Sequence, residues 1–275
     1  GIVGESGCGK STLGKMIAGI LPPTTGTIHF ESLRKSGDQR PNALKTQMIF
    51  QDPFSSLNPR KKVVDILTEA PLHHGLISKS ERRSFALEML SRVGLDSEAM
   101  ERYPHQFSGG QRQRIGIARA LAVSPELLVC DESIAALDVS IQAQVLNLFV
   151  HLKREYDLTY LFISHDIGVI EHISDRVVVM YLGRIVETAP IEIFVEKPNH
   201  PYTKALLDGV PRLEIGKRNY EPVSGEIPSP LEPPSGCHFH PRCRFATDTC
   251  KISKPALLEI APGHFSACHL NPSEK

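Results

Sequence analysis

The chain has 275 residues and a mass of 30.4 kDa, which corresponds to one large domain or two modest ones. It carries 31 Lys and Arg against 31 Asp and Glu, and this balance argues against a nucleic-acid partner, because phosphate binding normally requires a basic surplus. Hydrophobic residues make up 41%, but no apolar stretch reaches the roughly 18 residues of a membrane-spanning helix, so we expect a folded protein that does not itself cross a membrane.

Residues 4–11 read GESGCGKS and fill the pattern GxxxxGK[ST], between apolar Ile2–Val3 and a helical pattern. The context predicts a phosphate-binding loop, because backbone N–H groups of a glycine-rich loop can wrap phosphates closely and the helix N-terminus adds positive potential. Lys10 is expected to reach the β- and γ-phosphates, and Ser11 to hold Mg²⁺. The residues expected to contact nucleotide here are Gly4, Ser6, Gly7, Cys8, Gly9, Lys10, Ser11 and Thr12. The alternative is a chance glycine-rich turn, with Cys8 as a small filler.

The segment that precedes this loop is short. Only Gly1–Val3 precede the first loop glycine, whereas a strand feeding such a loop normally has several apolar residues. We therefore expect the sequence to begin in mid-domain; an ordered nucleotide base contacted by this chain alone would argue against that.

Beyond the loop, the periodicity changes several times. Apolar runs and alternation predict strands at 27–31 and 46–50, and helical spacing predicts a helical insertion over 52–105. Strands and helices then alternate, with helices expected at 109–124, 140–156 and 167–174 and strands at 126–132, 159–166 and 176–183. This order predicts the α/β class, a mostly parallel sheet covered by helices, with chemistry at the carboxyl ends of the strands. Beyond Pro190 a Pro-rich composition predicts an appendage.

Two carboxylates end the predicted strand at 126–132. Asp131 and Glu132 follow the apolar run Leu127–Cys130, and burying adjacent carboxylates is costly unless they serve a cation or a water. Beside a phosphate loop, the first carboxylate supports Mg²⁺, usually through water, and the second can deprotonate the attacking water. An acidic strand end exposed to solvent is the alternative to these roles for Asp131 and Glu132.

Three further positions are candidates. His165 ends the next predicted strand and could reach the same phosphates, although a lone histidine is more often a structural hydrogen-bonding group. Gln51 follows the strand at 46–50, and its amide oxygen could ligate Mg²⁺ or the attacking water. Phe107–Gln111 reads FSGGQ before an Arg-bearing helix, which is either a second anion-binding device or an ordinary helix cap.

Taken together, the segments GESGCGKST, FQDP, FSGGQ, LLVCDE, ALD (Ala136–Asp138) and ISHD occur in an order and at intervals that resemble ATP-binding cassette (ABC) ATPases. Within that superfamily the chain resembles the ATP-binding subunits of bacterial dipeptide and oligopeptide importers. The closer resemblance rests on QMIFQDPFSSLNPR at 47–60, DVSIQAQVLNL at 138–148, HPYTKALL at 200–207 and PSPLEPPSGCHFHPRC at 228–243. It implies a P-loop ATPase core over 1–190, a helical subdomain over about 52–123, a missing N-terminal β part and an importer-type extension over 191–275.

The resemblance also implies a mechanism. Two such subunits dimerise head to tail, and each ATP is held between one subunit's phosphate loop and the other's SGGQ segment. Ser108, Gly109, Gly110 and Gln111 would then contact the partner's nucleotide. Glu132 would be the general base, His165 the γ-phosphate contact, Gln51 the link to the helical subdomain and Asp138 part of the interface.

The same resemblance implies the cofactors and partners. ATP and Mg²⁺ would energise uptake of dipeptides and oligopeptides at the cytoplasmic face of the bacterial membrane. The partners would be a second ATPase subunit, two transmembrane permease subunits and an extracytoplasmic peptide-binding protein, with no nucleic acid.

This sequence departs from the family in two ways. Ser133–Ile134 replaces the usual Pro-Thr after the catalytic carboxylate, and the β-branched Ile could shift Asp138 or weaken dimer closure. No residue matches the aromatic that stacks on adenine, so weak nucleotide binding and little ATPase activity are expected of the isolated chain. A catalytically impaired binding partner is therefore one alternative. A cassette ATPase acting on nucleic acid or ribosomes is another, but the paired cassettes, coiled-coil insertions or basic surfaces that it predicts are missing from the sequence.

Four cysteines, Cys237, Cys243, Cys250 and Cys268, gather in the last segment. In an intracellular protein, clustered thiols favour metal binding over disulfides, although the spacing lacks the CxxC pairs of zinc ribbons. Because some dipeptide-importer subunits carry an iron-sulfur cluster at a similar place, the resemblance favours such a cluster. A zinc site that includes nearby histidines, or unligated thiols, are the alternatives; the histidines are His238, His240, His264 and His269.

Overall fold

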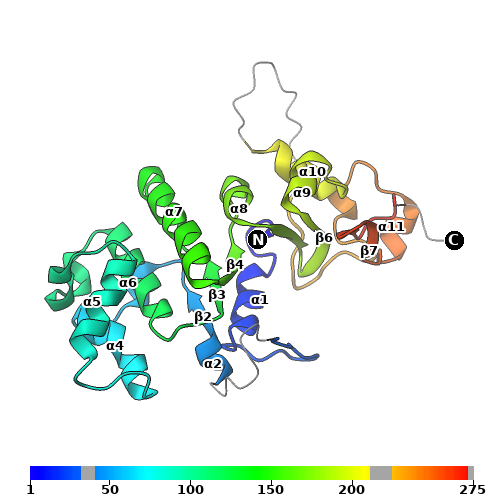
Figure 1. Cartoon of the computed structure of the whole chain (residues 1–275). Coiled ribbons are helices and arrows are strands. Elements are labelled where there is room, and N and C mark those ends of the chain that lie inside the picture. The colour runs from blue at the N-terminus through cyan, green and yellow to red at the C-terminus, as the bar shows by residue number, and fades with distance from the viewer. Residues whose placement is uncertain (32–40, 211–224, 272–275) are drawn as a thin grey trace. The chain divides into compact units, whose positions relative to one another are not determined.

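The computed structural model describes residues 1–31, 41–210 and 225–271, and the chain divides into two compact units (Figure 1). One unit is Ser11–Ile163, and the other combines Gly1–Lys10 with Ser164–Lys275. The first residues of the chain therefore fold with its carboxyl-terminal part. Each unit is described on its own below.

Three parallel strands form the centre of the Ser11–Ile163 unit. They are β2 (Thr46–Ile49), β3 (Leu127–Asp131) and β4 (Thr159–Ile163), with β3 in the middle. Leu128–Cys130 are fully buried, as expected for a central parallel strand that carries a continuous apolar run. Helix α1 (Lys10–Ile17) comes so close to this sheet at Gly14 that a Cβ there would lie 2.7 Å from Cδ1 of Ile163. The carboxyl ends of β2 and β3 meet at one edge, which brings the residues that follow them together.

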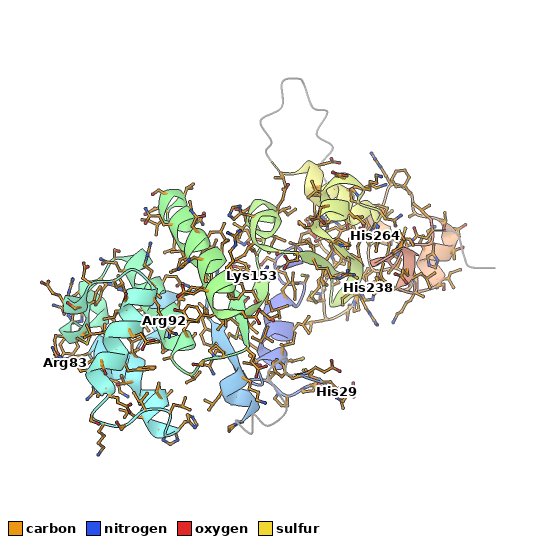
Figure 2. The ribbon with its side chains drawn as sticks, in the orientation of Figure 1. His29, Arg83, Arg92, Lys153, His238 and His264 are labelled. Carbon is orange, nitrogen blue, oxygen red and sulfur yellow. The ribbon has the colours of Figure 1, made fainter. Side chains whose placement is uncertain are left out.

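The chain between β2 and β3 is helical, as its periodicity predicts. Figure 1 shows α4, α5 and α6 grouped together, and Figure 2 marks Arg83 and Arg92 on α5. Each of the three helices contributes a fully buried residue to this helical group: Leu67, Leu90 and Ile115. The remaining helices of the unit are α2, which precedes β2, and α7, which joins β3 to β4. The elements are α2 (Asn42–Lys45), α3 (Pro53–Ser56), α4 (Val63–His73), α5 (Arg82–Arg92), the 3-10 turns Ser97–Glu101 and Pro104–Gln106, α6 (Gly109–Leu121) and α7 (Val139–Tyr156).

The second unit is built on a mixed sheet. Strand β1 (Ile2–Val3) pairs in parallel with β5 (Arg176–Tyr181), and the order continues antiparallel through β6 (Arg184–Pro190), β8 (His264–Ser266) and β7 (Leu258–Ala261). Its helices are α8 (Ile167–Ile173), α9 (Ile191–Glu196), α10 (Pro201–Asp208), the 3-10 turn His240–Arg242 and α11 (Asp248–Ile252). Strands β8 and β7, near the carboxyl end of the chain, thus extend the sheet that carries β1.

The α/β class and most elements are confirmed, but the strand predicted at 27–31 is wrong. The structure leaves Thr27–Glu31 without regular structure, and all but Phe30 of these residues are exposed. A strand needs a neighbour to satisfy its backbone groups. No strand pairs with 27–31 among the described residues, so alternation alone does not make one. In the described ranges, no helix combines the length and the apolar character that crossing a bilayer requires.

Candidate active site

The phosphate loop follows the short strand β1, and its glycines adopt backbone conformations that other residues rarely reach. Gly4, Gly7 and Gly9 have φ angles of 152°, 77° and 103°. At Gly4 a Cβ would lie 2.2 Å from the carbonyl oxygen of Met180, so the loop can pass strand β5 only because this side chain is absent. The local sequence therefore dictates the shape of the loop.

Lys10 folds back over the loop. It is buried, and its Nζ donates to the carbonyl oxygens of Gly4 at 2.8 Å and Glu5 at 3.0 Å. The Cys8 thiol lies 3.9 Å from this ammonium, yet burial, the largest influence, raises the thiol pKa above its ordinary value. A buried thiol that stays protonated at neutral pH is consistent with Cys8 as a space-filling residue.

The carboxyl edge of the other unit brings together four polar side chains. The Ser11 hydroxyl donates to Oδ1 of Asp131 at 2.8 Å, and Nε2 of Gln51 donates to Oε2 of Glu132 at 2.9 Å. Asp131 is 7% exposed. The parallel register of β2 and β3 brings Gln51, Asp131 and Glu132 to one edge. Ser11, in α1, reaches the same edge through its hydrogen bond to Asp131.

Glu132 has a strained backbone. Its φ is 46°, in the left-handed region that costs a non-glycine residue roughly 1 kcal/mol or more. Two hydrogen bonds hold it there: its N–H donates to Ile163 at 2.9 Å, and its carbonyl accepts from Ala135 at 3.0 Å. Such strain persists where the surroundings fix it, and here it aims the Glu132 side chain at Gln51.

The SGGQ segment begins helix α6. Ser108 is the helix N-cap: its Oγ accepts from the Gln111 N–H at 3.3 Å, and the Ser108 N–H donates to Oε1 of Gln111 at 3.1 Å. At Gly110 a Cβ would lie 2.4 Å from Cγ2 of Ile141 on α7, so a glycine here allows α6 and α7 to pack closely. The exposed Asp138 is the residue before α7, and its carbonyl accepts from Ile141 at 2.9 Å.

The departure at Ser133–Ile134 is accommodated inside the turn between β3 and α7. Both side chains are buried, and the Ile134 carbonyl accepts hydrogen bonds from the Leu137 N–H at 3.1 Å and Nε2 of Gln142 at 3.0 Å. The isoleucine is therefore part of a closed, hydrogen-bonded turn.

His165 belongs to the unit that contains the phosphate loop, and it is exposed. Its neighbours are fixed: the Ser164 N–H donates to Ile2 at 3.2 Å, and the Asp166 carboxylate caps α8 by accepting from Gly168 at 2.9 Å. The backbone on both sides of His165 is thereby held next to strand β1 and the start of α8.

Comparisons with known proteins decide the family. The ABC transporter model matches residues 1–135, and a model described as "Oligopeptide/dipeptide transporter, C-terminal region" matches residues 186–250. The chain is 52% identical to the oligopeptide transport ATP-binding protein AppF of Bacillus subtilis, over 98% of this chain and 84% of that protein. It is 49% identical to the dipeptide transport ATP-binding protein DppF of Haemophilus influenzae, over 97% and 83%. The chain belongs to the ATP-binding proteins of ABC transporters.

A solved structure agrees with this membership. The cbiO1 protein of Clostridium perfringens, part of the ABC transporter complex cbiONQ, matches with a TM-score of 0.60 and 30% identity, over 72% of this chain and 79% of that chain. The fold is that of a P-loop ABC ATPase, and the chain is an ATP hydrolase of that family.

The donor set at the carboxyl edge suits the Mg²⁺ that an ABC ATPase uses. A hydroxyl, an amide and two carboxylates provide only the hard oxygen donors that this ion prefers. Ser11 and Asp131 already lie within hydrogen-bonding distance of each other, so their oxygens can face a common ion.

The C-terminal extension of this ABC ATPase contacts the phosphate loop directly. Arg242 donates from Nη1 to Oε2 of Glu5 at 2.7 Å and from Nη2 to Oε1 at 3.0 Å, a two-bonded pair. The Arg242 side chain is 5% exposed, and that of Glu5 23%. Hydrogen bonding to Glu5 raises the pKa of Arg242, so the guanidinium is always charged.

The backbone of Glu5 has a second partner in the same part of the chain: its N–H donates to the hydroxyl of Tyr202 at 2.9 Å. We name Glu5, Arg242 and Tyr202 the loop clamp.

Aromatic rings support the loop clamp. Tyr202 packs against Tyr181 with 4.8 Å between ring centroids, and Phe239 lies 5.2 Å from Tyr181. Nearby, burial lowers the pKa of His200 to about 4, so this histidine is neutral, and its Nδ1 accepts from the Tyr202 N–H at 3.1 Å. The loop clamp is therefore packed against aromatic rings and a neutral histidine.

Cys237, Cys243, Cys250 and Cys268 line one small pocket of the extension, with His200, His240 and His269. All four are free thiols, and burial raises the pKa of Cys237 to about 11. Within the described ranges, however, no group of three or more His, Cys, Asp or Glu side chains is arranged to hold a metal ion. The structure gathers the predicted cysteines but does not confirm a metal site.

Sequence reasoning missed the loop clamp. Glu5 lies inside the phosphate-loop motif and Arg242 inside the HPRC segment, but 237 positions separate them and no local pattern links them. The sequence offered one indication, the charge of Arg242. An arginine that is buried in a cysteine-rich and aromatic segment needs an acidic partner.

Proposed function

We propose that this chain hydrolyses ATP to energise import of dipeptides and oligopeptides through a membrane permease. Support for the substrate class comes from two relatives, an oligopeptide and a dipeptide transport ATP-binding protein, that are 52% and 49% identical over nearly the whole chain. The match of residues 186–250 to the peptide-transporter C-terminal model supports the same class.

The proposed reaction uses the carboxyl edge. Mg²⁺ would be held by Ser11 and Gln51, with Asp131 supporting it through water, and it would neutralise phosphate charge. Glu132 would accept a proton from the water that attacks the γ-phosphate, and Gln51, which bonds Glu132 at 2.9 Å, would orient both the base and the water. The observation that carries this assignment is the pairing of Ser11 with Asp131 and of Gln51 with Glu132 at one strand edge.

The phosphates would lie on the backbone N–H groups of the loop and on Lys10, and His165 would contact the γ-phosphate. Ser108, Gly109, Gly110 and Gln111 would bind the nucleotide held by a second ATPase subunit, with Asp138 at the interface between the two. The position of the SGGQ segment at the start of α6 supports this proposal, because the positive end of a helix attracts an anion.

The proposed organisation is an ABC core over 1–190, with its helical subdomain at about 52–123, and an extension over 191–275. The partners would be a second ATPase subunit, two permease subunits that cross the membrane and an external peptide-binding protein. The chain would lie at the cytoplasmic face of the bacterial membrane.

Reconstitution tests this function. The complete transporter in proteoliposomes is expected to accumulate a labelled dipeptide or tripeptide only when ATP and the peptide-loaded binding protein are present. A matched preparation with Lys10→Ala is expected to bind the binding protein but not to transport, because the phosphates lose their cation. Peptide uptake that does not depend on ATP, or ATP turnover that no peptide stimulates, would exclude the proposal.

We further propose that the four cysteines ligate an iron-sulfur cluster, with zinc as the alternative. Their position around one pocket supports this, since four thiolates are the usual ligand set of such clusters. Metal would also keep the thiols deprotonated, which burial by itself disfavours.

Anaerobic purification decides between the metals. Iron and acid-labile sulfide with visible absorbance are expected, and Cys243→Ser is expected to lose both. A colourless protein with stoichiometric zinc would reject the cluster, and a protein with neither metal would reject the site.

A further inference from the structure

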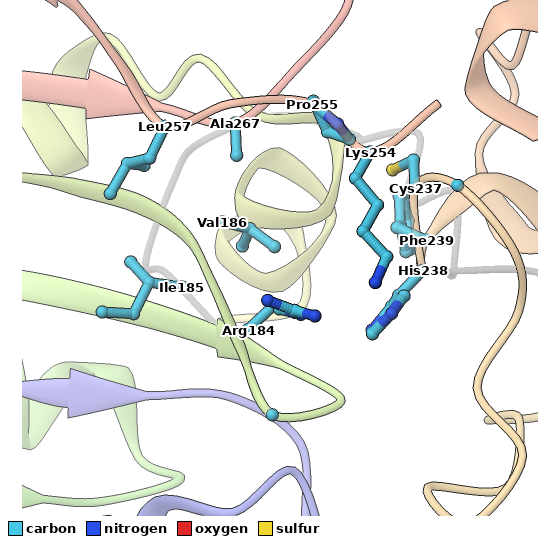
Figure 3. A pocket seen from close by; sticks show the side chains of 12 residues that line it. Arg184, Ile185, Val186, Cys237, His238, Phe239, Lys254, Pro255, Leu257 and Ala267 are labelled. Carbon is cyan, nitrogen blue, oxygen red and sulfur yellow. The ribbon is translucent and has the colours of Figure 1, made fainter. Parts of the chain in front are cut away.

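A second pocket, outside the nucleotide site, lies in the unit that holds the phosphate loop. It has a volume of about 390 Å³, which is within the range of small-molecule sites. Its walls come from three places: the turn between β5 and β6 with the start of β6, the Gly236–Phe239 segment, and four residues near the carboxyl end, Lys254, Pro255, Leu257 and Ala267. Figure 3 shows these walls facing one cavity.

The pocket has an apolar part and a cationic part. Ile185, Val186, Leu257 and Ala267 form most of the apolar lining. In Figure 3, the ends of the Arg184, Lys254 and His238 side chains turn toward the same part of the cavity. Both cations also lie close enough to His238 to act on its ring electrostatically.

In the part of the chain that the structure describes, Arg184 and Lys254 have no acidic partner. None of the residues that line the pocket is Asp or Glu. Among the described residues, no ion pair or hydrogen bond involves the side chain of Arg184 or Lys254. Both cations are exposed, so water screens part of their mutual repulsion, but an anion placed between them would be attracted by both.

The pocket is linked to the phosphate loop by the turn between β5 and β6. Leu182 and Gly183 form this turn with φ angles of 41° and 74°. The Gly183 N–H donates to the carbonyl oxygen of Cys8, in the phosphate loop, at 2.9 Å. On the other side, Nδ1 of His238 donates to the carbonyl oxygen of Leu182 at 3.2 Å. The same turn therefore touches both the pocket wall and the loop.

We propose that this pocket binds a small organic carboxylate with an apolar body, and that its occupancy changes the affinity of the phosphate loop for ATP. The carboxylate would lie between Arg184 and Lys254, and the apolar body would cover Val186 and Leu257. A ligand there restrains His238 and Gly183, so it acts on the turn that bonds Cys8. This site is separate from the residues proposed for ATP hydrolysis.

Ligand binding to the 275-residue chain tests the site without nucleotide, so failure of this test is distinct from failure of the proposed transport function. The probes are hexanoate, decanoate and 4-phenylbutyrate, titrated by calorimetry, with 4-phenylbutanamide as the uncharged analogue. At least one carboxylate is expected to bind, and 4-phenylbutanamide at least roughly tenfold more weakly than 4-phenylbutyrate, the loss expected for a charge-assisted hydrogen bond.

The double variant Arg184→Gln/Lys254→Gln is expected to lose at least roughly tenfold in carboxylate affinity, whereas Lys204→Gln, an exposed lysine on α10, is expected to bind normally. Both altered cations are exposed, so thermal unfolding should match the unmodified chain. The site is overturned if the amide binds as well as the acid, if the double variant binds normally, or if no carboxylate binds at roughly 10 mM, which would fill even a millimolar site.

The second part of the proposal is tested by measuring ATP affinity with and without saturating carboxylate. The dissociation constant of ATP is expected to change, and ATP must change carboxylate affinity by the same factor. The change should vanish in the double variant Arg184→Gln/Lys254→Gln. Unchanged ATP affinity would overturn the link between the pocket and the phosphate loop.

Discussion

Replacing Glu132 by glutamine is expected to lower kcat for ATP hydrolysis by roughly 100- to 10,000-fold, the range that a general base contributes, while ATP still binds. The amide keeps the size of the side chain and an oxygen that can accept from Gln51, but it cannot take a proton from water. The backbone of Glu132 is held at φ 46° by hydrogen bonds that the substitution does not touch. The geometry of the strand edge should therefore survive, and the effect should fall on the chemical step.

Steady-state hydrolysis gives kcat and equilibrium binding gives the ATP affinity, and both are measured in the assembled transporter. Glu196→Gln, an exposed carboxylate on α9, is the matched control and should hydrolyse ATP at the normal rate. A Glu132→Gln transporter with normal kcat would show that another group accepts the proton. A variant that no longer binds ATP would show that Glu132 acts on the nucleotide instead of the water.

Breaking the loop clamp is expected to lower both the stability of the chain and its ATPase activity. Arg242→Met is expected to reduce the free energy of unfolding by roughly 3 kcal/mol, the lower end of the range for broken buried pairs, because Glu5 is 23% exposed. It should also lower kcat/KM for ATP by roughly 10- to 100-fold, since the Glu5 side chain in the loop loses the partner that fixes its position. Both losses would follow from a substitution in the extension, at a residue outside the ATPase motifs.

The double-mutant cycle with Glu5→Gln isolates the pair. If Arg242 acts through Glu5, the double variant should be little worse than Arg242→Met, because neither side chain has a charge left to satisfy. Arg244→Met, two residues away and exposed, is the matched control. Metal content is measured in each variant, because Arg242 is next to Cys243. Additive losses in the cycle, or normal ATP kinetics for Arg242→Met, would contradict the role of the clamp.

Local patterns predicted the elements with strong periodicity. The buried run Leu127–Cys130 forms the central strand β3, and the amphipathic stretches between 52 and 123 form helices, because burial and backbone geometry there follow from nearby residues. The alternation at 27–31 predicted a strand wrongly, since a strand depends on a neighbour that local sequence does not specify.

Parts of the site were predictable for the same reason. Asp131 ends β3 and Gln51 follows β2, and parallel strands align their carboxyl ends, so their convergence could be expected from order alone. The loop clamp and the Arg184–Lys254 pocket depend on how the extension folds onto β5 and β6, which is a matter of long-range packing. No spacing in the sequence encodes that packing.

The central claim is that ATP is held between the phosphate loop of one ATPase subunit and the SGGQ segment of another. Photocleavage of the vanadate-trapped transporter tests it most directly, because vanadate in the place of the γ-phosphate cuts the backbone beside it under ultraviolet light. The prediction is two sets of fragments from this chain, one cut within residues 4–11 and the other at Ser108. Cleavage within 4–11 alone, with Ser108 intact in every trapped complex, would contradict it.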